Sequence, residues 1–118
     1  MSYNSFENLE IWQRASKLAV MLYKALQDCR DFGLKDHMSR SAVSIASNIA
    51  EGAERDSRAE FSRFLHIAKG SAAELRTQVY IAGQVGLFSK TLESELAMEL
   101  KAISSMIHGL IKSLKPKT

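Results

Sequence analysis

The sequence predicts an all-α fold, an antiparallel up-and-down four-helix bundle that forms a single domain over residues 1–118. Apolar residues recur at steps of three and four in four separate segments, which is the period of an α-helix. No segment alternates apolar and polar residues as a strand would. The connections between the segments are short, so consecutive helices are expected to run antiparallel.

The first two predicted helices cover about residues 6–30 and 34–52. Each carries one apolar stripe, as expected of a helix with one buried face. Ser5 or Asn8 is suited to cap the first helix, and the Asp-Phe-Gly sequence that follows it predicts a break. Gly52 is predicted to end the second helix, since glycine is favoured just beyond a helix C-terminus.

The third predicted helix covers about residues 57–86 and is the longest. Asp56 or Ser57 is suited to cap it, and Glu60 stands three residues after Ser57, as in a capping box. Gly86 is predicted to end it. At 1.5 Å per residue, a helix of this length measures about 42 Å and predicts a rod-shaped domain.

The fourth predicted helix covers about residues 89–114, and Pro116 follows it as a terminator. Steps of four and three persist along this helix and the third, a spacing typical of helices packed nearly parallel to their neighbours. The expected core residues of these two helices are Phe61, Leu65, Ala68, Ala72, Leu75, Val79, Ala82, Leu92, Leu96, Leu100, Ile103, Ile107, Leu110 and Leu114.

The composition fits a folded domain: 46% of the residues are hydrophobic and 25% are charged. The single cysteine, Cys29, cannot form an intramolecular disulfide. No apolar run approaches the 18 or so residues of a membrane-spanning helix. The first residues do not resemble a signal or transit peptide. We therefore expect a cytoplasmic protein with no membrane partner.

Catalytic and metal-binding motifs are absent from the sequence. The three histidines, His37, His66 and His108, fall on three different predicted helices, and none belongs to a zinc-binding pair. No nucleophile elbow or glycine-rich phosphate loop follows a strand. We expect no enzymatic activity, no metal, no cofactor and no small-molecule substrate.

A polar stripe borders the apolar stripe of the second helix. It includes Ser44, Asn48 and Glu51, and Glu74 on the third helix is a candidate cross-helix partner. In one interpretation the small serines permit close packing, while the amide and carboxylate are hydrogen-bonded locally. In the other, these residues form a buried polar network that shapes a ligand-facing or intersubunit groove.

A basic stripe follows the third helix. Arg58, Lys69 and Arg76 lie within about 20° of one another, Tyr80 is close by, and the stripe extends over about 27 Å. Such a row suits phosphates and a stacked base, as in RNA or single strands. With a net charge of only +3, an ordinary solvated face is the alternative. Lys112, Lys115 and Lys117 add a basic C-terminus.

Some branched aliphatic residues lie away from the predicted core. Ile67, Ile81 and Val85 stand on the outer side of the third helix, and Val43 and Ala50 on that of the second. A monomeric bundle would leave them exposed. Aliphatics in register favour burial against another copy of the chain, a homo-oligomer interface.

Several motifs resemble those of the four-helix-bundle proteins encoded in intervening sequences of 23S ribosomal RNA genes. The most specific is Ser-Asn-Ile-Ala-Glu-Gly at residues 47–52, and the resemblance extends over about residues 6–114. The other matching positions are Arg40, Ser44, Ile45, Arg55, Glu60, Phe61, Arg63, Phe64, Leu65, Ala68, Gly70, Ser71, Glu74 and Leu75.

The resemblance implies an up-and-down bundle, a ring-shaped homopentamer and no catalytic residues. The similar accessory variability determinant proteins of diversity-generating retroelements imply a basic surface that binds RNA and a reverse transcriptase. Arg40 and Arg63 are cations that match the family pattern. The chain departs from that pattern at His37, Ser39 and Ala46, which removes one expected cation and one proline.

Two functions fit the sequence. The first is a non-enzymatic oligomeric scaffold that binds structured RNA or a ribonucleoprotein through basic faces repeated around a ring. The second is a protein-only adaptor whose grooves hold a partner protein, with the basic stripe incidental.

Overall fold

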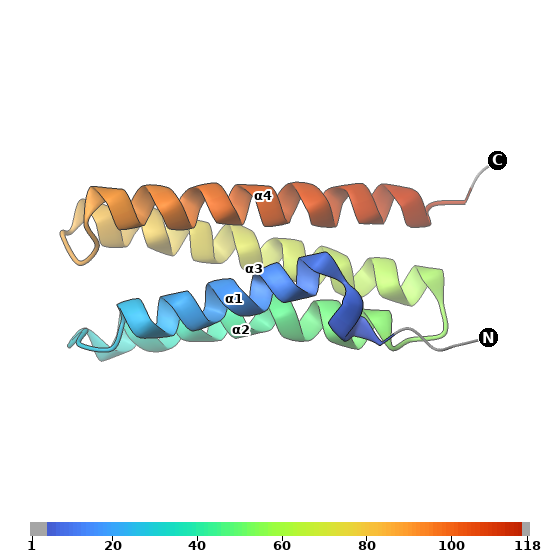
Figure 1. Ribbon diagram of the computed structural model, residues 1–118, viewed down its shortest axis with the longest axis horizontal. Helices are drawn as coiled ribbons and strands as arrows, with labels where there is room; N and C mark the ends of the chain where they lie inside the picture. The colour runs from blue at the N-terminus through green and yellow to red at the C-terminus, as the bar shows by residue number, and fades with distance from the viewer. Residues whose placement is uncertain (1–4, 117–118) are drawn as a thin grey trace.

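A computed structural model describes residues 5–116 of the chain. These residues form a rod of 48 × 26 × 21 Å, drawn in Figure 1 with its long axis horizontal. The all-α four-helix bundle predicted from the sequence is confirmed. Its elements are a short 3₁₀ helix η1 (Phe6–Asn8) and the helices α1 (Glu10–Ala25), α2 (Phe32–Ala53), α3 (Arg58–Gln84) and α4 (Lys90–Leu114).

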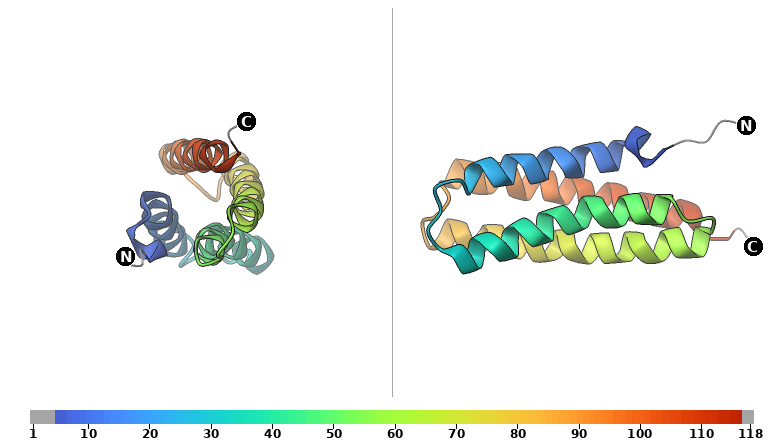
Figure 2. Two further views of the ribbon diagram at one scale, coloured as in Figure 1. Left: turned by 90° about the vertical axis from the view of Figure 1, so that its right-hand side faces the viewer. Right: turned by 90° about the horizontal axis from the view of Figure 1, so that it is seen from below.

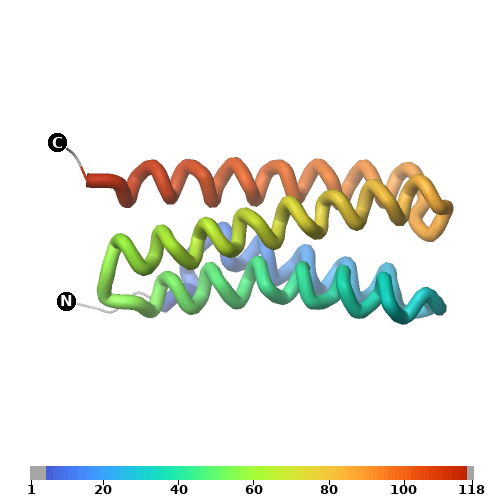
Figure 3. The backbone as a smooth tube through the Cα atoms, turned by 180° about the vertical axis from the view of Figure 1, so that it is seen from behind, coloured from blue at the N-terminus to red at the C-terminus, as the bar shows by residue number. Residues whose placement is uncertain are grey.

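The helices pack in chain order and alternate in direction. The end view of Figure 2 shows them around one axis. α3 is central to the packing, because it contacts α2 and α4 more extensively than any other two elements contact each other. Figure 3 shows α3 running between these two neighbours along the rod. α1 packs mainly on α2 and only sparsely on α4.

The apolar stripes of the four helices meet in one continuous core. Burial of these side chains is the main stabilising contribution to a bundle of this size. The stripes are those expected from the sequence, although the end residues Leu34, Phe61, Leu92, Leu110 and Leu114 are half-buried. The largest fully buried side chains are Leu18, Leu22, Leu26, Met38, Ile45, Ile49, Leu65, Leu75, Leu96, Leu100, Ile103 and Ile107.

The first helix is shorter than the predicted range of residues 6–30. Ser5 caps η1, and Leu9 then adopts an extended conformation, so that α1 begins only at Glu10. The Phe6 ring meets the Trp12 ring edge-on at 5.1 Å, which holds η1 against the first turn of α1. At the other end the helix stops after Ala25, and a turn leads to α2.

The break predicted at residues 31–33 is instead the start of α2. The Asp31 carboxylate accepts a hydrogen bond from the Leu34 backbone N–H at 3.1 Å, so Asp31 is a helix cap. Ser57 caps α3 in the same way through the Glu60 N–H at 3.1 Å. The Glu60 carboxylate does not complete the capping box, because it pairs with Arg63.

Gly52 does not end α2, which continues to Ala53. Its position is explained by packing: a Cβ atom there would lie 2.7 Å from the Cβ of Phe64 and 3.3 Å from the carbonyl oxygen of Phe61. Glycine is therefore required for the close approach of α2 to α3 near the corner between them. The helix end is set by the turn that follows it.

One ion pair joins α1 to α4 where their apolar contact is sparse. The Arg14 guanidinium donates to both Glu99 carboxylate oxygens, at 2.6 and 2.9 Å. These hydrogen bonds lower the pKa of Glu99 and raise the pKa of Arg14. A further N–H of Arg14 approaches the Met106 sulfur at 3.4 Å.

Candidate nucleic-acid interface

A row of cations follows the line where α3 and α4 meet, and we call it the basic seam. Its spacing places it on one side of each helix, because 18 residues complete five α-helical turns. On both helices the first gap is 11 residues and the next is 7, with His108 filling the third α4 position and Lys115 following 7 residues later. The cations are Arg58, Lys69 and Arg76 from α3, with Lys90, Lys101 and Lys115 from α4 and its C-cap.

Direct contacts join the two halves of the basic seam. The Lys69 Nζ atom lies 3.3 Å from His108 Nδ1, midway along the rod. The Arg58 guanidinium donates to the Ser113 carbonyl oxygen at 3.2 Å, near the α4 C-terminus. Because α3 and α4 run antiparallel, the C-terminal part of α3 lies against the start of α4. There, Tyr80 and Lys101 line one pocket.

The positive charge of the basic seam is largely unpaired. Among residues 5–116, five of its six cations have no carboxylate oxygen within 4.0 Å. The exception is Lys90, whose Nζ atom lies 3.3 Å from Glu93. Six cations and one carboxylate give this surface a net charge of +5, against +3 for the whole chain. The remaining residues together therefore carry −2.

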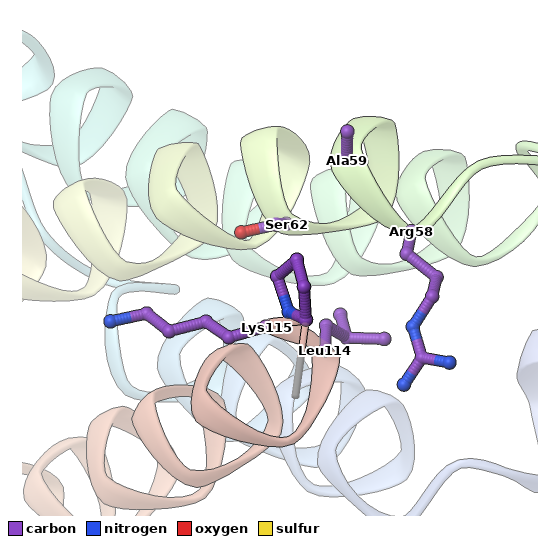
Figure 4. A pocket seen from close by; sticks show the side chains of 6 residues that line it. Arg58, Ala59, Ser62, Leu114 and Lys115 are labelled. Carbon is purple, nitrogen blue, oxygen red and sulfur yellow. The ribbon is translucent and has the colours of Figure 1, made fainter. Parts of the chain in front are cut away.

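An open groove of about 710 Å³ occupies one end of the basic seam. Arg58, Ala59 and Ser62 line it from α3, and the residues at the α4 C-terminus line it from the other side. In Figure 4 the charged ends of Arg58 and Lys115 lie on opposite sides of Leu114. The groove therefore combines an apolar wall with two cations.

A smaller pocket of about 260 Å³ occupies the other end. Its aromatic wall is Tyr80, which is 39% exposed, and Met98 is an exposed apolar neighbour. Lys90 and Lys101 also line it. The Glu93 side chain is only 15% exposed, because its carboxylate folds over the position where Gly83 lacks a side chain.

Two of the cations expected to bind nucleic acid lie outside the basic seam. Arg40 pairs with Asp36 at 3.2 Å on α2, and its side chain is 80% exposed. Arg63 pairs with Glu60 at 3.0 Å on the α2 side of α3, and its guanidinium stacks on the Phe64 ring at 4.6 Å. The hydrogen bond between them lowers the pKa of Glu60 and raises the pKa of Arg63.

Part of the predicted polar network forms where α2 meets α3, beside a groove of about 280 Å³ that we call the α2–α3 groove. The hydroxyls of Ser44 and Ser71 join the helices at 2.8 Å, and the Asn48 amide donates to the Ser44 hydroxyl and carbonyl. The Ser41 hydroxyl donates to Glu74 at 3.1 Å. Its lining residues are Asp36, His37, Arg40, Ser41, Ser44, Ser71 and Glu74.

Glu51 stands apart from this network. Its side chain is exposed, and no hydrogen bond to it occurs within residues 5–116. Its charge acts instead on Arg63 across the helix pair, where it helps to raise the pKa of that guanidinium. Asn48 therefore bonds locally within α2, as in the first interpretation, while Ser44 reaches α3. The ligand-facing or intersubunit role of the groove stays a prediction.

The aliphatic residues assigned to an oligomer interface are exposed, as expected for a single copy of the bundle. Ile67, Ile81 and Val85 are 42%, 50% and 65% exposed on α3 and its C-cap. Val43 on α2 is also exposed, while Ala50 is half-buried.

The α4 side of the basic seam is missing from the sequence-based prediction, which omits Lys90 and Lys101 and includes Lys115 only as part of a basic C-terminus. The sequence does contain a signal, since Lys90, Lys101, His108 and Lys115 repeat the spacing of Arg58, Lys69 and Arg76. Lys117 lies outside the described residues.

His37, His66 and His108 are all exposed. Within residues 5–116, no group of three histidine, cysteine, aspartate or glutamate side chains is arranged to hold a metal ion. Nor does any helix in this part of the chain have the length and apolar character needed to cross a membrane.

Comparison with known protein families gives a match to one family. A family model described as 23S rRNA-intervening sequence protein matches residues 7–109. Among solved structures, the chain is similar to a protein of unknown function from the S23 ribosomal protein family of Bacteroides thetaiotaomicron. The TM-score is 0.82 at 24% sequence identity, and the match covers 86% of this chain and 98% of the other. No curated protein matches the chain.

Proposed function

The chain belongs to the 23S rRNA-intervening sequence protein family, and from this premise we propose that it is a non-enzymatic, homo-oligomeric scaffold that binds RNA through the basic seam. The motifs around residues 47–52 had indicated this family. The proposed ligand is structured RNA or a ribonucleoprotein, and the proposed assembly is a pentamer. The ligand and the assembly are both proposals that go beyond membership of the family.

The observation that carries the proposal is the unpaired charge of the basic seam. Its net charge of +5 exceeds that of the whole chain, so the rest of the molecule is slightly acidic. A phosphate backbone binds where cations release its counterions, and paired cations contribute little because their charge is already neutralised. The basic seam is therefore the surface on which we expect phosphates to bind.

Repetition of the basic seam would compensate for the modest charge of one copy. Five copies of a chain with a net charge of +3 carry about +15 on one particle. An RNA that contacts two or more seams at once gains avidity, because the second contact becomes intramolecular. At 100° per residue, Ile67, Ile81 and Val85 lie on the opposite side of α3 from Arg58 and Arg76, which leaves the seam free in such an assembly.

Charge reversal tests the proposal. The double variant Lys69→Glu/Arg76→Glu removes two unpaired cations, and its control Arg40→Glu/Arg63→Glu removes two paired ones. Each lowers the net charge from +3 to −1, since every reversal removes two charges. In a filter-binding salt titration, we expect the seam variant to reduce the slope of log affinity against log salt by about 1 per cation.

The control double variant should leave that slope nearly unchanged. Equal losses in the two variants would show that net charge, rather than the basic seam, governs binding. No binding of the unmodified protein to RNA at low salt would reject the proposal.

The exposed aliphatics favour a second candidate, a protein-only adaptor. A partner protein held on the Ile67, Ile81 and Val85 side would cover apolar surface that a single copy leaves in water. Such a partner should remain bound after nuclease treatment and at high salt. Release of bound RNA at high salt, with no partner protein still attached to the chain, would instead favour the RNA-binding scaffold.

A further inference from the structure

The two ends of the basic seam share a design that its middle lacks. At each end a pocket brings an apolar wall together with two cations. At one end the wall includes Leu114 and Pro116, with Arg58 and Lys115 beside them. At the other it includes Tyr80 and Met98, with Lys90 and Lys101. Between them lie Arg76, Lys69 and His108, a polar stretch.

Apolar walls beside cations suit the faces of unpaired bases. An aromatic ring such as Tyr80 stacks on any base, and an arginine plane such as that of Arg58 does the same. In an A-form duplex the base faces are stacked inside the helix, so a protein meets phosphates, 2′-hydroxyls and groove edges. A duplex would leave both apolar walls unused.

The separation of the two pockets limits the length of the bound strand. Arg58 and Tyr80 are 22 residues apart on one helix, which is about 33 Å at 1.5 Å per residue. An extended strand rises more than the ~3.4 Å per nucleotide of a stacked duplex strand, so about ten nucleotides is the upper limit. The lower limit is about four, the smallest site of single-strand binding grooves.

The acidic group at this surface does not oppose such a strand. Glu93 is the one carboxylate that lines either pocket, and it is 15% exposed. It lies against the backbone at Gly83 and is paired with Lys90, so its charge faces α3. Lys101, by contrast, has no carboxylate within 4.0 Å among the described residues.

We propose that the basic seam binds a single-stranded segment of RNA, with one base in the Tyr80 pocket, another in the Arg58 groove, and the intervening phosphates on Lys69 and Arg76. This inference rests on the proposed function and specifies its ligand. The segment would be a loop, bulge or end of an otherwise structured RNA, because those are the places where bases are unpaired.

Fluorescence anisotropy with labelled RNA at low salt tests this inference on the full chain. The probes are oligouridylates of 2 to 14 nucleotides and a blunt 14-base-pair RNA duplex. We expect affinity to rise with length and to level off by about ten nucleotides, where the strand spans both pockets. The duplex should bind at least about tenfold more weakly than the 14-nucleotide strand.

Two variants of one residue separate stacking from folding. Tyr80→Ala should weaken binding of the 14-nucleotide strand by about fivefold or more, the usual effect of losing one stacked base. Tyr80→Phe retains the ring and should stay within about twofold. Because Tyr80 is exposed, both variants should keep the helical circular dichroism of the parent.

The possible outcomes are distinct. Duplex binding as tight as single-strand binding, lost in Lys69→Glu/Arg76→Glu, would overturn this inference and leave the proposed function standing. Equal affinity of Tyr80→Ala and Tyr80→Phe would also overturn it, since no base would then be stacked there. Absence of all RNA binding would remove the proposed function and this inference together.

Discussion

The two surfaces that flank α3 differ in the number of cations they carry and in how those cations are paired. In the α2–α3 groove the polar side chains bond one another, as Ser44 does with Ser71 and Ser41 with Glu74. Its arginine, Arg40, is paired with Asp36. Along the basic seam, five cations lack a carboxylate partner among residues 5–116. The two surfaces therefore differ both in the number of cations and in whether a carboxylate lies next to each of them.

The difference also separates two proposed roles. A groove whose polar groups are already bonded to one another offers little to an ionic ligand, whereas the exposed Ile67, Ile81 and Val85 of α3 and its C-cap are suited to a protein surface. A seam of unpaired cations is unfavourable as a protein interface unless the partner is acidic. RNA and a second copy of the chain are thus expected on opposite sides of α3.

The largest effect is expected where α2 and α3 approach most closely. Gly52→Ala places a Cβ atom 2.7 Å from that of Phe64 and should destabilise the fold by about 2–3 kcal/mol, as overpacked sites do. Gly70→Ala is the control, since nothing lies within 4 Å of its new Cβ, and it should stabilise by about 0.5–1 kcal/mol. Urea denaturation measures both. Stabilisation by both alanines would contradict the close approach.

The proposed oligomer gives the next test of the two sides of α3. Ile67→Asp/Ile81→Asp should convert a particle of about 65 kDa, five copies of 13.1 kDa, into monomers, as measured by light scattering after size exclusion. Each isoleucine buried in an interface would contribute about 1.5–3 kcal/mol. Val20→Asp/Tyr23→Asp on α1 is the control, with similarly exposed residues and the same change in charge. A 13.1 kDa mass for the unmodified chain would refute the homo-oligomer.

The ion pair between α1 and α4 predicts a smaller, pH-dependent effect. Arg14 lowers the pKa of Glu99, so the pair stabilises the fold fully above the ordinary glutamate pKa of 4.5. That contribution is lost as the pH falls through the lower pKa of the folded state. Glu99→Gln should cost about 1 kcal/mol at pH 7 and less at pH 3.

Thermal unfolding of Glu99→Gln and of the parent at several pH values measures this difference. Glu95→Gln is the control, because Glu95 is exposed and makes no ion pair within residues 5–116. A Glu99→Gln deficit that stays constant from pH 7 to pH 3 would indicate lost packing rather than a lost charge pair.

The smallest effect comes from releasing paired arginines on the α2 side of α3. Asp36→Asn/Glu60→Gln frees Arg40 and Arg63 and raises the net charge from +3 to +5. RNA affinity at low salt should rise by about twofold to fivefold, the value of one or two exposed ion pairs. Glu7→Gln/Glu95→Gln adds the same charge without freeing an arginine. If anisotropy shows equal gains for both, pairing does not distinguish the two grooves.

The fold is largely predictable because the sequence signals that define each helix lie within that helix. Regular apolar steps place a stripe on one face, and Ser57 marks a helix start by a short-range hydrogen bond. The errors lay at ends that depend on neighbours. α1 begins late because Leu9 is extended between η1 and the helix. The role of Gly52 depends on Phe64, which belongs to the next helix.

The candidate site was only half predictable for the same reason. Arg58, Lys69 and Arg76 share a helix, so their common face follows from the sequence alone. Lys101 joins them only when α3 and α4 are placed side by side. The i, i+3 spacing of Glu60 and Arg63 does predict an ion pair from the sequence alone. That signal distinguishes Arg63 from the unpaired cations of the basic seam.

The spacing of the basic seam also restricts how the protein can change in length. One residue inserted between Lys69 and Arg76 would turn Arg76 by about 100° and remove it from the surface that faces the ligand. Seven residues would keep it in place and move it about 10 Å along the rod. Since α3 and α4 run antiparallel, α4 would need a matching insertion. Homologues of different length should therefore differ by paired insertions of about seven residues, a pattern visible in aligned sequences.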